Sequence, residues 1–238
     1  NTIGSKATVT MCLYYCEEDL FISALKKNCN NHDYFVIMPH FKSESKDYVC
    51  YTPNVIKAIE TIPKQKLIIL DNSYKEIPGI LAAIYQDYEE DIKHALELAL
   101  DKLKNYKKII LIYPTNLIFP LPTDIQVGFI KFCNHHNFEF EIFDEIHDNL
   151  EFKSKVAYIT IDDGNLVHLI QQIRKKKLVM GKDIGVISYN ETPLKALLGI
   201  TVISTDFKGM GEAAAKLILS KKKEISKNPF NYIERNSL

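Results

Sequence analysis

Short apolar runs alternate with longer amphipathic stretches along most of the chain. The apolar runs are rich in β-branched residues and nearly unbroken, as strands are when helices cover both faces of a parallel sheet. Strands are therefore predicted over residues 7–14, 34–38, 66–70, 108–113, 156–161 and 184–188. The intervening stretches repeat apolar residues at spacings of three and four, which is typical of amphipathic helices. These helices are predicted over residues 17–27, 53–61, 89–103, 123–135, 165–176 and 211–219.

This order of strands and helices predicts parallel sheets joined by right-handed crossovers. Ligands of such sheets bind beyond the carboxyl ends of the strands, so function is expected directly after each strand. The chain has 238 residues, a length that allows two small domains. We therefore expect an α/β fold made of two doubly wound parallel-sheet lobes.

Hydrogen-bonding side chains follow nearly every predicted strand. They are His40, Asp71, Asn72, Thr115, Asn116, Asp162, Asp163, Asn190, Glu191 and Thr192. Carboxylates and amides without a nucleophile suit a polyhydroxylated ligand, because each sugar hydroxyl needs both an acceptor and a donor. The sequence contains no G-x-G-x-x-G, G-x-x-x-x-G-K-[ST], G-x-S-x-G or H-E-x-x-H motif. A small sugar or sugar phosphate is the expected partner, with no cofactor and no catalytic set.

The charge balance and the cysteine content indicate which partners and which cellular compartment to expect for this protein. Thirty basic residues balance thirty acidic ones, so the chain has no net positive field to attract a nucleic acid by itself. The five cysteines are odd in number and lack metal-type pairing, which indicates reduced thiols in a cytoplasm. No stretch approaches the roughly 20 apolar residues of a membrane span, and no secretory leader opens the chain. A removed export signal remains an alternative.

Residues 181–191 read GKDIGVISYNE. This run resembles the "G-x-D-I-x-V-I-G-[FY]-D-D" segment of the LacI/GalR repressors and their periplasmic sugar-binding relatives. Residues 201–214 are similar to the family's "T-T-V-x-x-D-x-x-x-M-G-x-x-A", and residues 232–237 to its closing "L-I-x-R-x-S". Upstream, the matches are Gln86-Asp87 to "V-x-x-D", Gly128-Phe129 to the end of "R-x-x-G-F" and residues 161–163 to "A-N-D". In this order the resemblance covers residues 67–238.

The resemblance implies a periplasmic-binding-protein-like type I fold with three crossings between the lobes, near Asp87, Ser204 and Lys223. The first lobe is then predicted to comprise residues 1–87 and 205–223, and the second residues 88–204 and 224–238. Residues 35–39 and Gln86-Asp87 look most like the effector domains that GntR-type regulators of sugar catabolism carry behind a winged helix. Regulators of L-fucose or L-arabinose use are examples.

Three departures from the family pattern stand out. Only 33 residues precede Tyr34, so the family's first strand and helix, and any DNA-binding domain, are expected to be absent here. The arginine of "R-x-x-G-F" falls at Ile125, and the acidic pair of the family is Asn190-Glu191. The Asn190-Glu191 pair keeps the hydrogen bonding of the family's two aspartates, but asparagine at position 190 removes the first of their two negative charges.

The resemblance implies an effector domain of a homodimeric transcriptional repressor. A sugar held between the lobes favours their closed arrangement and so controls DNA binding by a winged-helix domain outside this chain. The alternative within the same fold is the sugar-binding protein of an ABC transporter. An α/β enzyme such as a sugar isomerase or kinase is a third hypothesis, which lacks an identifiable catalytic set.

The predicted ligand-binding residues are Asp162, Asn190, Gln86, Asp87, Tyr189, Asn116, His40 and Glu191. Asp162 aligns with the family's amide position, and its alternative role is to cap the helix that follows. We assign the ligand to Asp162 and the cap to Asp163. Asn190 stands where relatives hold the sugar with an aspartate, and its alternative is an Asx-turn.

The remaining candidates also have structural alternatives. Gln86 and Asp87 lie at a predicted crossing, but they also precede a helix that they could cap. His40 and Asn116 follow strands, although such residues are commonly surface or core positions. Tyr189 is the tyrosine best placed to stack on a sugar, or else a core residue. The His135-His136 and Glu139-Glu141 pairs resemble metal ligands only superficially, as a helix end and the solvated face of a strand, so no metal site is predicted.

Overall fold

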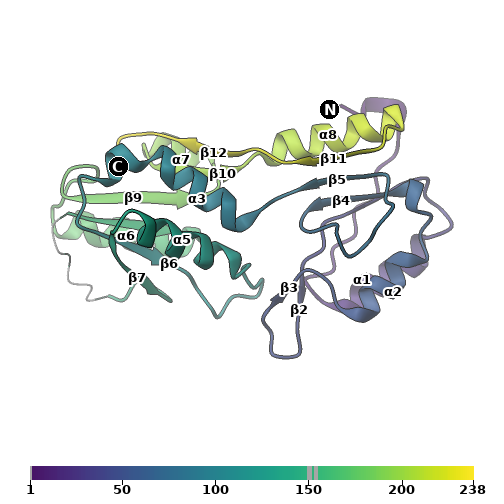
Figure 1. Cartoon of the computed structure of the whole chain (residues 1–238), viewed down its shortest axis with the longest axis horizontal. Coiled ribbons are helices and arrows are strands. Elements are labelled where there is room, and N and C mark those ends of the chain that lie inside the picture. The colour runs from purple at the N-terminus through teal and green to yellow at the C-terminus, as the bar shows by residue number, and fades with distance from the viewer. Residues whose placement is uncertain (1, 149–151, 153–154) are drawn as a thin grey trace. The chain divides into compact units, whose positions relative to one another are not determined.

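Two parallel sheets, each with its own helices, form the framework of the chain (Figure 1). The computed structural model describes residues 2–148, 152 and 155–238. The first unit comprises Asn1–Asp87, Ile118–Pro122 and Asp206–Pro229, and the second Tyr88–Leu117, Thr123–Thr205 and Phe230–Leu238. The predicted α/β fold with two parallel-sheet lobes is confirmed.

The first unit is built on a parallel sheet of order β1-β4-β5-β11. Its strands are β1 (Phe35–Ile37), β4 (Leu67–Asp71), β5 (Ala82–Tyr85) and β11 (Glu224–Lys227). Its helices are α1 (Glu18–Asn28), α2 (Pro53–Glu60) and α8 (Phe207–Ser220), with short 3-10 turns at Gly4–Lys6 and Lys64–Lys66 and a hairpin of β2 (Phe41–Lys42) and β3 (Tyr48–Val49).

The nearly unbroken apolar run of β4 is explained by helices on both faces of this sheet. Leu67 and Ile69 pack in one cluster with buried residues of α1 and α2. Ile68 and Leu70 point to the other face and pack with Met210 and other residues of α8. Because successive side chains of a strand face opposite ways, only a strand covered on both faces is apolar throughout.

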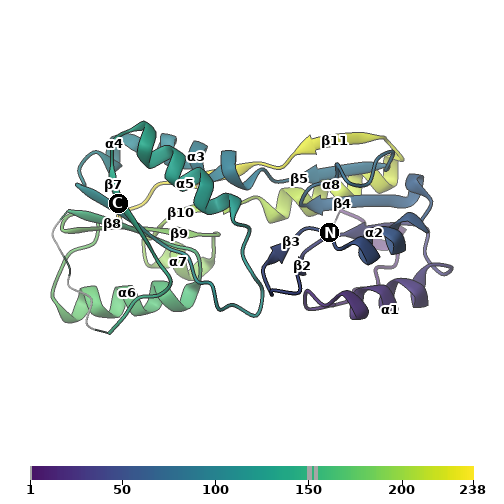
Figure 2. The same ribbon diagram turned by 60° about the horizontal axis from the view of Figure 1, so that its bottom comes forward.

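The second unit is built on a sheet of order β12-β10-β9-β8-β6-β7, parallel except for β12, which runs antiparallel to β10. The strands are β6 (Lys108–Ile112), β7 (Glu139–Phe143), β8 (Val156–Thr160), β9 (Ile184–Tyr189), β10 (Thr201–Thr205) and β12 (Phe230–Ile233). The helices are α3 (Tyr88–Leu98), α4 (Leu100–Leu103), α5 (Asp124–His135), α6 (Asp163–Lys175) and α7 (Pro193–Leu197). Figure 2 shows α6 on the opposite side of this sheet from α3 and α5.

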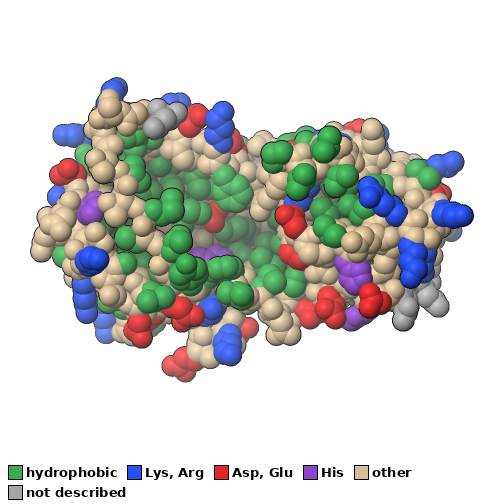
Figure 3. All heavy atoms as spheres, turned by 180° about the vertical axis from the view of Figure 1, so that it is seen from behind, with side chains coloured by type: hydrophobic (Ala, Val, Ile, Leu, Met, Phe, Trp, Pro, Cys, Tyr) green, Lys and Arg blue, Asp and Glu red, His purple; other side chains and the backbone are tan. Residues whose placement is uncertain are grey.

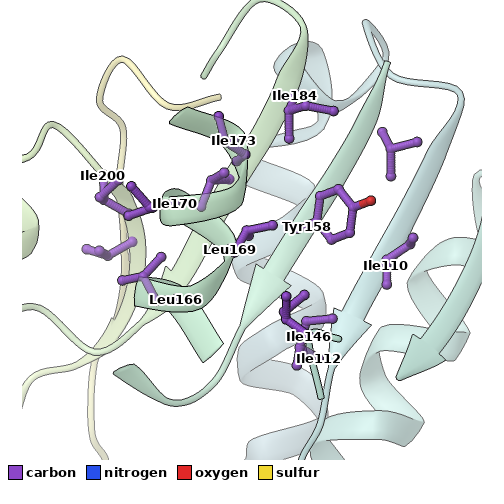
Figure 4. Close-up of a cluster of buried hydrophobic side chains, with 13 residues drawn as sticks. Ile110, Ile112, Ile146, Tyr158, Leu166, Leu169, Ile170, Ile173, Ile184 and Ile200 are labelled. Atoms are coloured by element: carbon purple, nitrogen blue, oxygen red, sulfur yellow. The ribbon is translucent and has the colours of Figure 1, made fainter. Parts of the chain in front are cut away.

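The core between the second sheet and α6 contains the buried ring of Tyr158 among aliphatic side chains, with Phe143 and Phe152 packed against it. Tyr158 of β8 is 1% exposed and lies with Ile110 and Ile112 of β6 opposite Leu169 and Ile173 of α6 (Figure 4). On the other face α3 and α5 approach each other closely at Gly128. A Cβ there would lie 2.2 Å from the carbonyl oxygen of Glu89, so only glycine permits this crossing.

The strand predicted over residues 7–14 is absent, and that prediction is wrong. Residues 7–13 are exposed, including the apolar Val9, Met11 and Leu13, and Figure 3 shows hydrophobic side chains on the surface of the first unit. A strand exists only where a partner completes its hydrogen bonds. Within the described part of the chain, no strand pairs with residues 7–14, and β1 is an edge strand.

The third predicted crossing also differs from the structure. It was placed near Lys223, but residues 224–227 form β11, which pairs in parallel with β5 of the first unit. The chain therefore passes to the second unit between Pro229 and Phe230. Among the described residues no helix has the length and apolar character of a membrane span.

Candidate functional site

Three strands of the second unit end at one edge of their sheet. The parallel register pairs Ile112 of β6 with Thr160 of β8, and Thr160 with Ser188 of β9. The residues that follow these strands therefore leave the sheet at the same edge. The structure thus brings five predicted site residues to this carboxyl edge, namely Asn116, Asp162, Tyr189, Asn190 and Glu191.

Asp162 caps helix α6. Its Oδ1 accepts a hydrogen bond of 2.9 Å from the backbone N–H of Asn165, and its Oδ2 accepts one of 2.7 Å from the Asn165 amide. The assignment of the cap to Asp163 is therefore wrong. Asp163 is the first residue of α6, and its carboxylate pairs with Lys195 at 2.8 Å. Capping does not prevent ligand binding, because each carboxylate oxygen can accept a second hydrogen bond. The ligand role of Asp162 stays a prediction.

Asn190 turns the chain sharply at the end of β9. Its φ of 62° lies in the left-handed region, which asparagine tolerates better than most residues. Its backbone N–H donates to the carbonyl oxygen of Ile203 at 2.8 Å. The Asn190 Oδ1 atom is buried and has no hydrogen-bond partner among the described residues. A buried unpaired acceptor costs about 1 to 3 kcal/mol, which a hydroxyl donor from a ligand would offset.

Lys195 stabilises the turn at Asn190. This lysine was not identified from the sequence as part of the site. Its side chain is only 5% exposed, and its Nζ donates to the carbonyl oxygens of Tyr189 at 2.5 Å and Asn190 at 3.0 Å. With the Asp163 ion pair, the lysine links the ends of β8 and β9. Only its place three residues after the Thr192 cap of α7 could have suggested a role.

Tyr189 is buried in the second unit, where its hydroxyl has no hydrogen-bond partner among the described residues, whereas Glu191 forms an ion pair. The Tyr189 ring is 6% exposed and lies 5.8 Å from the ring of Phe230. Burial, followed by the negative charge of Asp91, raises the pKa of the Tyr189 phenol well above its ordinary value. Because the ring is buried, stacking of Tyr189 on a sugar is disfavoured in this structure. The ligand-binding role of Tyr189 stays a prediction. Both carboxylate oxygens of Glu191 accept hydrogen bonds of 2.9 Å from the Arg235 guanidinium.

Three further predicted residues follow the parallel strands of the first unit. His40 follows β1, and its Nε2 lies 2.7 Å from the carbonyl oxygen of Pro120, so this nitrogen carries the proton and donates. Burial lowers the pKa of His40, and this hydrogen bond partly opposes the shift. Gln86 and Asp87 follow β5, the first buried and the second exposed.

Asn72, directly after β4, is a second buried polar residue at the carboxyl edge of the first sheet. Its Oδ1 accepts a hydrogen bond from the Tyr48 hydroxyl, and its Nδ2 donates to the carbonyl oxygen of Pro39 at 2.6 Å. Asn72 therefore fixes the chain between β1 and the hairpin. The candidate site residues of this unit remain His40, Gln86 and Asp87.

Two doubly wound α/β units with polar residues at the carboxyl edges of their sheets define a ligand-binding class of fold. The chain belongs to the periplasmic binding protein-like domain family, whose model matches residues 99–237, more than half of the chain. No curated protein sequence matches the chain. The resemblance inferred from the motifs is confirmed at the level of this family.

Solved structures with the same fold include regulators of the LacI family. A LacI family transcriptional regulator from Lactobacillus casei with bound glucose is 15% identical, covers 97% of this chain and 88% of its own, and has a TM-score of 0.71. A periplasmic binding protein/LacI transcriptional regulator from Alkaliphilus metalliredigens, complexed with D-xylulofuranose, is 14% identical. The match covers 99% of this chain and 90% of the regulator, with a TM-score of 0.66. The LacI family regulator CCPA from Weissella paramesenteroides with bound glucose is 18% identical. The match covers 93% of this chain and 83% of the regulator, with a TM-score of 0.66.

Proposed function

We propose that this chain is the sugar-binding effector domain of a transcriptional regulator and that it binds its sugar without converting it. The observation that carries the proposal is the buried Oδ1 of Asn190 at the carboxyl edge of the second sheet, an acceptor with no hydrogen-bond partner among the described residues. A sugar hydroxyl is a donor of the right kind for this acceptor. The LacI family regulators from Lactobacillus casei and Weissella paramesenteroides, which have this fold, hold glucose.

In this proposal Asn190 and Asp162 accept hydroxyl protons of the sugar at the carboxyl edge of the second sheet. His40, Gln86 and Asp87 are the candidate ligand-binding residues at the carboxyl edge of the first sheet. A ligand that binds one conformation of the protein more tightly than another shifts the equilibrium by that difference in affinity. Typical coupling free energies of about 1 to 3 kcal/mol are enough to change DNA binding.

The finer assignments are part of the same proposal. We assign the chain to a GntR-type repressor of sugar catabolism that acts as a homodimer in the cytoplasm, with L-fucose or L-arabinose as the ligand. DNA binding then belongs to a winged-helix domain outside these 238 residues, since the chain carries no net charge. The five cysteines, all free in the structure, fit a reducing compartment.

A panel of monosaccharides and sugar phosphates tests the proposal. We expect L-fucose or L-arabinose to raise the midpoint of thermal unfolding in proportion to the logarithm of sugar concentration, because the ligand binds only the folded chain. Prolonged incubation followed by NMR of the sugar should show it unchanged. A folded protein that responds to no member of the panel would overturn the proposal, and conversion of the sugar would instead reveal an enzyme.

A further inference from the structure

The carboxyl-terminal end of α5 places two histidines beside a glutamate of α3. His135 is the last residue of α5 and His136 follows it, as the sequence predicted for a helix end. Glu97 lies on α3, and one donor atom from each of these three side chains lies within 4.8 Å of the others. The Nε2 of His136 is 2.8 Å and 2.9 Å from the two carboxylate oxygens of Glu97.

We propose that Glu97, His135 and His136 form a binding site for Zn²⁺ or a similar borderline divalent transition metal. Two imidazoles and one carboxylate are the donor types that such ions prefer over Mg²⁺ and Ca²⁺. Three protein ligands leave a fourth position for water. The prediction of no metal site considered the His135-His136 and Glu139-Glu141 pairs, whereas the structure places Glu97 of α3 beside the two histidines.

The geometry requires only small movements. Bonds of about 2.0 to 2.2 Å around a tetrahedral zinc ion separate the donor atoms by about 3.3 to 3.5 Å. The His136 and Glu97 donors, now 2.8 and 2.9 Å apart, must therefore separate by about half an ångström, while the His135 side chain moves toward them. The His135 side chain is exposed, and its ring centroid already lies 4.7 Å from that of His136.

The rest of the site is held by the packing of the two helices. The ring of His136 lies 4.9 Å from the buried ring of Phe132, and the close approach at Gly128 fixes α5 against α3. The side chains of His136 and Glu97 are 20% and 35% exposed. An ion held there is partly shielded from water, so its attraction to the carboxylate is stronger than at an open surface.

This site is separate from the candidate sugar site. Helix α5 follows β6 and leads into the amino-terminal end of β7, so its last residues lie at the amino edge of the second sheet. Asn190 lies at the opposite, carboxyl edge. The metal proposal therefore stands or fails independently of sugar binding.

Calorimetric titration of the full chain with ZnCl₂ tests the proposal. The exposed thiols of Cys12 and Cys29 would also bind zinc, so both are first changed to serine. We expect one ion per chain, bound more weakly at about pH 5.5 than at about pH 7.5 because a protonated imidazole cannot coordinate a metal. Zinc should also raise the midpoint of thermal unfolding.

The variants identify the ligands. Glu97→Gln keeps a hydrogen-bonding partner for His136, and His135→Ala changes an exposed side chain, so both proteins should fold. Each is expected to weaken zinc binding at least about tenfold. His168→Ala is the matched control, because His168 pairs with Asp148 at 2.9 Å outside any three-ligand cluster of the described residues. Absence of saturable binding, or binding unchanged in Glu97→Gln and His135→Ala, would overturn the proposal.

Discussion

Arg235 holds Glu191 through two parallel hydrogen bonds of 2.9 Å, which join the closing segment of the chain to the end of β9. The same guanidinium donates to the carbonyl oxygen of Ile200 at 2.7 Å. Two residues on, the Ser237 hydroxyl accepts from the Thr201 N–H and donates to the carbonyl oxygen of Val186. The arginine and serine of the closing motif thus anchor the last residues to β9 and β10.

Changing Glu191 to Gln should reduce stability more than sugar affinity. A charge-assisted pair of hydrogen bonds is lost, and we expect a decrease of about 1 to 2 kcal/mol in the free energy of unfolding. Urea denaturation measures this loss. Sugar affinity should change less than about threefold, or under about 0.7 kcal/mol. A large loss of affinity with unchanged stability would instead make Glu191 a ligand contact.

Gly128→Ala should destabilise the second unit. The new methyl group would lie 2.2 Å from the carbonyl oxygen of Glu89 and 2.6 Å from the Cγ2 of Ile92, so α3 and α5 must separate. We expect a cost of about 1 to 3 kcal/mol, measured by urea denaturation. Gly211→Ala in α8 is the control, because its Cβ meets nothing within 4 Å. That variant should gain up to about 1 kcal/mol, and equal effects in the two variants would contradict the packing argument.

Lys195→Met should weaken the fold at the end of β9. The methionine fills similar space but leaves the carbonyl oxygens of Tyr189 and Asn190 without their buried donor. The expected loss is about 1 to 3 kcal/mol in the free energy of unfolding. Sugar affinity should fall as well, because the Asn190 turn is no longer held in place. The same change at Lys208, an exposed residue of α8, should have little effect on either quantity.

Stability should decrease as the pH falls through the titration of His40. Burial lowers the pKa of His40 below its ordinary value of 6.5, so the unfolded chain takes up the proton at a higher pH than the folded chain does. The stability that neutral His40 contributes is fully present above pH 6.5, and it is lost as the pH falls through the lower pKa of His40 in the folded chain. Urea denaturation at about pH 7.5 and about pH 5.5 should show a smaller decrease for His40→Gln than for the parent. His94→Gln, at an exposed position, should behave like the parent, and identical decreases in all three proteins would contradict the assignment.

The pattern of apolar residues predicted strands β1, β4, β6, β8 and β9 because their signals are local, whereas β5, β10, β11 and β12 were not among the predicted strands. Strand β4 and helix α6 are specified by their own periodicity and burial, and the polar residues after β8 and β9 follow from the parallel order. The failure at residues 7–14 has a physical reason: periodicity reports which residues suit a strand, not whether a neighbouring strand exists. The pairing of β11 with β5 was missed for the same reason.

The chemistry of the candidate site was less predictable. Asp162 and Asp163 are adjacent and chemically identical, so only the backbone angles of the helix start decide which residue caps α6. Lys195 and Asp163 are far apart in the sequence, and no spacing rule pairs them. The same holds for Glu97 and His136, which only the crossing of α3 and α5 brings together.

Calorimetric titration of the responding sugar into the parent chain and Asn190→Ala tests the central claim most directly. Asn137→Ala is the matched control, because Asn137 has a similar φ of 56° but precedes β7 at the other edge of the sheet. We predict that Asn190→Ala weakens binding at least about tenfold, or about 1.4 kcal/mol, while Asn137→Ala binds like the parent. Equal affinity in the parent and Asn190→Ala would contradict the account.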